Sequence, residues 1–188
     1  MTSFLNFLHR IQPISPALAQ AIAAVTVREN LPTQHLLLRP SQVARQVYFL
    51  ESGLVRGYTL LHSREVSSWF MQAGDFVISI ISFLTQQPSE EYLELLEPTV
   101  APSINYDQLQ ILYRDFPEFN YTDQLLIEKY YVLSEQRTSH LRSRTATERY
   151  ELLLQSFPTV FQRVAVQHIA SHLGMAPETL SWLRNRSA

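Results

Sequence analysis

Residues 166–185 read VQHIASHLGMAPETLSWLRN, and the spacing of residue types in this stretch predicts two short helices joined by a tight turn. Ala170 is small where the helices would cross, Gly174 allows the left-handed conformation at the turn, and Pro177 suits the first turn of a new helix. Four apolar residues would hold the pair against a core, namely Ile169, Leu173, Leu180 and Leu183. The stretch predicts a helix-turn-helix, whose second helix is shaped to enter a DNA major groove. An ordinary helical hairpin is the alternative.

The distribution of charge supports a nucleic-acid partner for this end of the chain. The formal net charge of the whole chain is −2, but residues 137–188 carry seven arginines against three glutamates, a net charge of +4. Residues 1–136 carry the compensating negative charge. A basic region that coincides with the two helices is what contact with phosphates requires.

Composition limits the remaining possibilities. The 188 residues suit one large domain or two small ones, and the absence of cysteine excludes disulfides, thiolate zinc sites and cysteine-bound iron–sulfur clusters. His35 and His62 could serve as axial ligands of a haem, but a lone histidine is far more often structural or solvent-facing, so we expect no metal and no cofactor. No apolar run approaches the roughly 18 residues that span a bilayer. Ala17–Ala19 resembles a signal-peptidase site, but no basic segment precedes it, so we predict a cytoplasmic protein without a signal peptide.

The chain before the basic region divides into helical and strand-like parts. Residues 3–28 have helical periodicity, which Pro13 and Pro16 divide into two helices, with Ser15 as an N-cap. Short apolar runs follow at intervals of about ten residues, at 35–38, 47–50, 54–61, 65–71, 93–96 and 101–105. Regular short strands separated by turn residues predict an α+β protein with an antiparallel jelly-roll barrel.

A short helix within residues 76–85 is expected to line the interior of this barrel. Its apolar side chains form a candidate effector pocket, made of Phe76, Val77, Ile78, Ile80, Ile81 and Phe83. The alternative is that these side chains simply fill the barrel.

A long helix from Pro117 to about Arg142 follows a short one capped by Asp107, and a helix capped by Thr147 comes next. The long helix carries an apolar stripe with a seven-residue period, typical of a pairing helix. The predicted dimerisation residues are Phe119, Leu126, Tyr130, Leu133 and His140. The alternative is a helix packed on its own barrel.

Three segments carry a resemblance to a known family. Ser52-Gly-Leu-Val-Arg-Gly-Tyr58 and Trp69-Phe-Met-Gln-Ala-Gly-Asp-Phe76 are similar to turns of the Crp/Fnr family of bacterial transcription regulators, and residues 167–181 are similar to its helix-turn-helix. The short C-terminal end resembles Bacteroidetes-type members. The resemblance implies a cyclic nucleotide-binding-like sensor domain at 1–115, a dimerisation helix at 116–145 and a DNA-binding domain at 146–188.

The sensor departs from the family members that bind cyclic nucleotides. Those members use a Gly-Glu pair for the ribose and an Arg-Ser pair for the phosphate, whereas the matching positions here are near Ile78-Ser79 and Ser89-Glu90-Glu91. A carboxylate in place of the arginine would repel the phosphate. We therefore predict no tight binding of cyclic AMP or cyclic GMP.

The resemblance also implies which residues contact DNA, namely Gln167, Pro177, Glu178, Thr179, Ser181, Trp182, Arg184 and Arg186. Trp182 stands where the family usually has an arginine that reads guanine, so the preferred DNA sequence should differ. Ala176 stands at the N-cap before Pro177, where a serine or threonine would accept a hydrogen bond.

The predicted partners are double-stranded DNA and a second copy of the chain, with a small-molecule effector and RNA polymerase as further candidates. The competing hypothesis is an effector-binding or protein-interaction module with a weakened DNA-binding domain. An enzyme is not expected, because the sequence has no His-x-His pair, Gly-rich phosphate loop, Gly-x-Ser-x-Gly or His-Glu-x-x-His motif.

Overall fold

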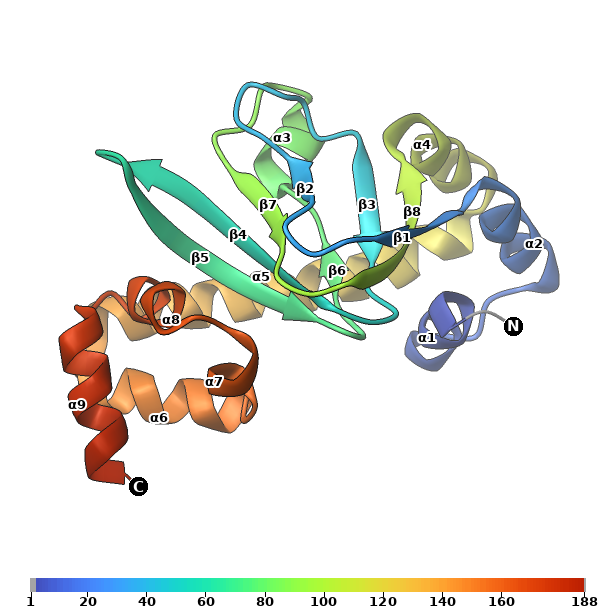
Figure 1. Ribbon diagram of the computed structural model, residues 1–188. Helices are drawn as coiled ribbons and strands as arrows, with labels where there is room; N and C mark the ends of the chain where they lie inside the picture. Colours follow the sequence, from blue (N-terminus) through green and yellow to red (C-terminus); the bar gives the residue numbers. More distant parts are fainter. Residues whose placement is uncertain (1–2, 188) are drawn as a thin grey trace.

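Strands between residues 27 and 105 form two four-stranded antiparallel sheets in the computed structural model, which describes residues 3–187 (Figure 1). One sheet has the order β1-β8-β3-β6, with the bounds Val27–Leu31, Thr99–Asn105, Gln46–Phe49 and Phe76–Val77. The other has the order β2-β7-β4-β5, with the bounds Leu36–Leu38, Tyr92–Leu95, Leu54–Leu61 and Arg64–Gln72. The predicted antiparallel architecture is confirmed, whereas the predicted jelly-roll barrel is not closed, because among the described residues the strands form two separate sheets. Residues 1, 2 and 188 of the predicted domains lie outside the described range.

The sequence did not predict two of the strands, β1 and β6, and the structure shows why. β1 is exposed along most of its length and contains Arg28, Glu29 and Asn30, so it shows no apolar alternation. β6 is only two residues long and pairs with the end of β3, where Phe76 lies opposite Phe49. The helix predicted over residues 76–85 therefore begins later, as α3, Ile80–Thr85.

β4 and β5 form a long hairpin with one close approach in its middle. Gly57 of β4 pairs with Trp69 of β5, and a Cβ atom on Gly57 would lie 2.3 Å from the Trp69 indole. The missing side chain therefore makes room for the buried ring of Trp69.

The N-terminal helices are α1, Ser3–Ile11, and α2, Pro16–Val25, as the two prolines predict. The Ser15 hydroxyl accepts a hydrogen bond from the Leu18 N–H at 3.2 Å, which confirms the predicted N-cap. Phe4 of α1 stacks on Phe49 of β3 with ring centroids 5.4 Å apart. This aromatic contact fixes α1 against the first sheet.

The middle helices are α4, Tyr106–Asp115, and α5, Pro117–Ser143. The long helix is confirmed, but the predicted cap of the short one is wrong: Asn105 caps α4, and its side chain accepts from the Asp107 N–H at 2.9 Å. The next helix, α6, Ala146–Ser156, likewise begins earlier than predicted. Its cap is Thr145, which forms a reciprocal capping box with Glu148 rather than leaving the role to Thr147.

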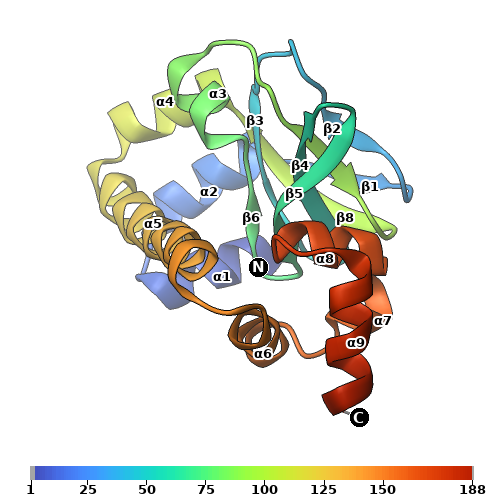
Figure 2. The ribbon, with the colours of Figure 1, turned by 90° about the vertical axis from the view of Figure 1, so that its left-hand side faces the viewer.

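The C-terminal helices share a second core. α6 packs with α7, Val160–Arg163, α8, Val166–His172, and α9, Pro177–Ser187, beside the sheets (Figure 2). The core contains Tyr150, Leu153, Val160, Ile169, Leu180 and Leu183, and Leu54 of β4 joins it. Within residues 3–187, no helix combines the length and apolar character that a membrane crossing requires.

Candidate nucleic-acid interface

The turn between α8 and α9 has the geometry that the sequence predicts. Gly174 has φ of +61°, in the left-handed region. The Met175 N–H donates to the Ala170 carbonyl at 3.0 Å and the Gly174 N–H to the Ser171 carbonyl at 3.1 Å, which together form a Schellman motif. The apolar residues predicted to hold the pair, Ile169, Leu173, Leu180 and Leu183, are all buried. The two helices are therefore locked at a fixed angle.

The outer surface of this helix pair presents the residues predicted to contact DNA. Leu180 and Leu183 direct one side of α9 into the core, and this leaves its other side in solvent. The exposed residues include Gln167, Pro177, Glu178, Thr179, Ser181, Trp182, Arg184 and Arg186. All of the predicted residues are thus accessible, and their contact with DNA stays a prediction.

Stacking orders the positive charge on α9. The Arg186 guanidinium lies over the Trp182 ring, 5.3 Å from its centroid, and 56% of Trp182 is exposed. The Arg184 guanidinium lies 4.8 Å from the centroid of Phe161. Cation–π contact holds both charges near the surface, and within the described part of the chain neither guanidinium has an acidic partner. Arg186 therefore brings a cation next to Trp182.

Sequence reasoning missed the contacts that fasten this helix pair to the second sheet. The Ser171 hydroxyl accepts from the Ser67 N–H at 2.8 Å and donates to the Glu65 carbonyl at 2.9 Å, so α8 lies against β5. His168 contacts Arg56, which also pairs with Glu65. Burial, followed by the nearby Arg56 charge, lowers the pKa of His168. These residues lie about 100 positions apart in the sequence, and no local pattern signals their contact.

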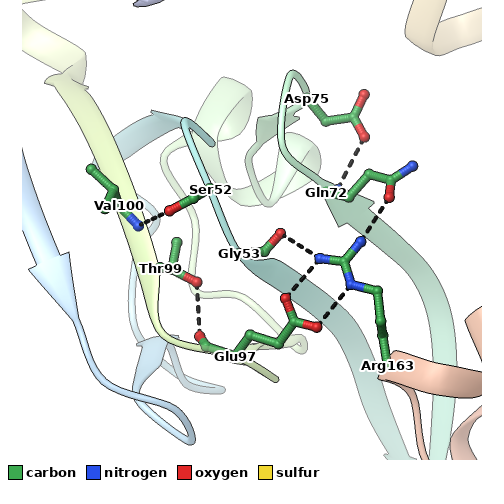
Figure 3. Close-up of polar contacts among 8 residues, drawn as sticks. All are labelled: Ser52, Gly53, Gln72, Asp75, Glu97, Thr99, Val100 and Arg163. Carbon is green, nitrogen blue, oxygen red and sulfur yellow. Dashed lines mark hydrogen bonds and ion pairs between the residues drawn. The ribbon is translucent and has the colours of Figure 1, made fainter. Parts of the chain in front are cut away.

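A second attachment is made by Arg163 of α7 (Figure 3). Its guanidinium donates to both carboxylate oxygens of Glu97, at 2.8 and 2.7 Å, and to the side-chain oxygen of Gln72 at 2.9 Å. It also donates to the Gly53 carbonyl at 3.1 Å. The hydrogen bonds from Arg163 lower the pKa of Glu97. The bidentate ion pair with Glu97 anchors the C-terminal helices to the turn after β7, and the hydrogen bond to Gly53 anchors them to the start of β4.

The predicted effector pocket is not assembled as expected. Val77 and Phe83 are buried in the core, and Phe76 and Ile78 pack against it. Ile80 and Ile81 instead face solvent, and 77% of Ile81 is exposed. α3 is a six-residue helix that packs only one of its sides against the core, so Ile80 and Ile81 on its other side cannot line an interior pocket.

Among residues 3–187, no cluster of His, Asp or Glu could hold a metal ion.

The predicted dimerisation stripe faces this chain's own core at its N-terminal end. Phe119 and Leu126 are buried in the core cluster, where Phe119 stacks on Tyr113 of α4 with ring centroids 5.4 Å apart, and the Tyr130 hydroxyl accepts from the Phe76 N–H at 2.8 Å. Leu133 is exposed and His140 is half-buried, further along α5. Phe119, Leu126 and Tyr130 thus pack within their own chain, and their part in dimerisation stays a prediction. A different side of α5 exposes Tyr121, Ile127, Tyr131 and Val132.

No protein-family model matches this sequence, and no curated protein matches it either. Solved structures match it by shape. The c-di-GMP responsive global regulator CLP of Xanthomonas campestris has a TM-score of 0.73 at 20% identity, covering 92% of this chain and 91% of that one. FixK2 from Bradyrhizobium japonicum has a TM-score of 0.72 at 20% identity, covering 86% and 84%. A protein of Eubacterium rectale assigned to the crp/fnr family of transcriptional regulators has a TM-score of 0.73 at 16% identity, covering 96% and 87%.

These matches define the class of fold, which is a mixed α and β structure with antiparallel sheets of the cyclic nucleotide-binding type. More particularly, it is the fold of the Crp/Fnr regulators, along nearly the whole chain. The resemblance seen in the sequence motifs is thus confirmed at the level of fold. The likeness to short Bacteroidetes-type members stays a prediction.

Proposed function

We propose that this chain is a homodimeric, DNA-binding transcription regulator that acts in the cytoplasm and affects RNA polymerase. The observation that carries the proposal is the exposed side of α9, where Arg184, Arg186 and short polar side chains surround Trp182 on a helix fixed by two buried leucines. The segments would have the predicted roles, with a sensor domain at 1–115, a dimerisation helix at 116–145 and a DNA-binding domain at 146–188.

DNA binding is tested by fluorescence anisotropy with a duplex of random sequence at several salt concentrations. Affinity should fall as salt rises, because phosphate contacts release counterions. Arg186→Ala should weaken binding and flatten the salt dependence. Arg28→Ala, on β1 of the sensor domain, is the matched control and should change neither. Absence of salt-dependent binding would favour the second candidate, a sensor or protein-interaction module with a vestigial DNA-binding unit.

Sequence preference is tested by selecting sites from random DNA. Glu178 can accept from a cytosine amine, and Thr179 and Ser181 can contact bases or phosphates. Trp182→Arg should restore bidentate recognition of guanine and enrich guanine at one position of each half-site. An unchanged preference would mean that Trp182 does not face the bases.

Dimerisation would use the solvent-facing side of α5 rather than the buried one. Tyr121, Ile127, Tyr131 and Val132 are each at least half exposed, and 64% of Tyr131 is accessible. A 27-residue helix with exposed aromatic and branched side chains suits pairing with a second copy. Tyr131→Glu together with Val132→Glu should convert dimer to monomer in sedimentation equilibrium, whereas Glu151→Gln, at an exposed position of α6, should leave the dimer intact.

The sensor is not expected to bind cyclic nucleotides. The Ser79 hydroxyl donates to the Glu91 carboxylate at 2.7 Å and contacts the Ser89 hydroxyl at 3.2 Å. These hydrogen bonds satisfy the polar groups among themselves, and the family resemblance would put the Glu91 carboxylate near the position at which related sensors hold a cyclic phosphate. Isothermal titration with cyclic AMP and cyclic GMP should give no micromolar binding.

A further inference from the structure

A cavity of about 570 Å³ lies between the second sheet and the C-terminal helices, away from the predicted effector pocket. Its walls come from β5, the C-terminal half of α5, α6 and α8. Figure 2 shows these four elements around one region, with α6 below the sheets and α8 beside β5. The volume falls within the range of small-molecule sites.

Most of the cavity surface is apolar. The apolar side chains that line it include Phe70, Leu133, Leu141, Leu153, Phe157 and Leu173. They belong to β5, α5, α6 and α8, so one apolar occupant could contact the sheet and the C-terminal helices together.

Arg137 of α5 is the unusual polar group of this cavity. Its side chain is half-buried, and within residues 3–187 it makes no hydrogen bond and no ion pair. Burial lowers the pKa of its guanidinium. The charge of Glu91 acts in the opposite direction and raises this pKa, but Glu91 forms no hydrogen bond with Arg137. A guanidinium withdrawn from water without a carboxylate partner is costly unless a bound anion compensates it.

The other charged groups around the cavity leave it with an excess of positive charge. Arg149 donates to two backbone carbonyls, those of Arg144 and Gly174, and has no acidic partner in the described part of the chain. Asp75 is the acidic residue in the lining, and its oxygens accept from the Gln72 N–H and the Tyr130 hydroxyl. His140 and His172 complete the titratable lining.

We propose that this cavity binds a carboxylate with an apolar body, of the medium-chain fatty acid class. The carboxylate would pair with Arg137, whose planar guanidinium matches two carboxylate oxygens, and the chain would lie over the apolar walls. The proposal does not depend on DNA binding, because the pocket and its charge belong to the chain alone.

The test is isothermal titration of the full-length chain with decanoate below its micellar concentration. Decanol supplies the same apolar chain without charge, and acetate supplies the charge without the chain. Decanoate should bind at least about tenfold more tightly than decanol, since hydrogen bonds to charged groups contribute that much, and acetate should not bind measurably.

Arg137→Gln should reduce decanoate affinity to that of decanol, and Arg137→Lys should retain part of the difference. Arg142→Gln is the matched control, because Arg142 is exposed on the same helix and does not line the cavity. Thermal melting of each variant verifies folding. Equal affinities for decanoate and decanol, no binding of either, or undiminished decanoate binding by Arg137→Gln would overturn the proposal.

Discussion

Arg56 shows how one buried cation joins distant parts of the chain. It is 1% exposed, and its guanidinium contacts Glu65 at 2.8 Å and Glu94 at 2.6 Å. The same guanidinium lies 3.9 Å from the centroid of the Tyr58 ring and contacts His168 of α8. Arg56 thus satisfies two carboxylates within the second sheet and reaches the helix pair.

Removal of Arg56 should be strongly destabilising. Arg56→Ala leaves Glu94 partly buried without its counter-ion, and breaking such a pair costs about 3 kcal/mol. Arg28→Ala is the control, because Arg28 forms an exposed ion pair with Glu51, and such a pair stabilises a protein by less than about 1 kcal/mol. The measurement is urea unfolding at pH 7.5. Equal losses for the two variants would contradict a central role for Arg56.

At the scale of single elements, α5 marks where sequence reasoning succeeds and where it ends. Pro117 and the apolar periodicity predicted its extent almost to the residue. The seven-residue repeat that includes Phe119 and Leu126 could not say what the helix packs against, since a core and a second subunit both select apolar residues. Likewise, the apolar run of α3 predicted a pocket, whereas a short helix at the surface leaves Ile80 and Ile81 exposed.

The start of α9 carries a second element-scale prediction. Ala176 precedes Pro177 and has no side-chain oxygen to accept the free N–H groups of the first turn. Ala176→Ser should stabilise the protein by about 1 kcal/mol and raise the melting temperature in calorimetry. The reverse comparison is Thr145→Ala, which removes the capping box of α6. This substitution should destabilise the protein by a similar free energy and lower its melting temperature. A fall in melting temperature for Ala176→Ser would mean that α9 begins elsewhere.

At the scale of the whole molecule, the docking of α8 on β5 should depend on pH. Burial, followed by the charge of Arg137, lowers the pKa of His172 from 6.5 to about 4. The folded state thus favours neutral His172, and its full stability is present above pH 6.5 and lost progressively as the pH falls from 6.5 towards 4. Hydrogen bonds with the backbone of Ser67 and Ser68 partly oppose this shift.

Unfolding free energies at pH 7.5 and pH 5 measure this effect. The contribution of His172 should fall by about 2 kcal/mol between these pH values. His172→Gln should remove that part of the pH dependence, whereas His62→Gln, at the exposed turn between β4 and β5, should not. Identical pH profiles for both variants would show that His172 is not held neutral by the fold.

The docking of α8 has a consequence for the solubility of the chain. β5 is the last strand of its sheet, and its free backbone groups at Glu65 and Ser67 are occupied by the Ser171 side chain. An uncovered edge strand is a template for edge-to-edge pairing between molecules, and here a helix acts as its cover. Ser171→Trp should displace α8 and increase light scattering on incubation, whereas Ser181→Trp on exposed α9 should not. Any rearrangement that frees the helix pair must therefore shield this edge in another way, or the protein will aggregate.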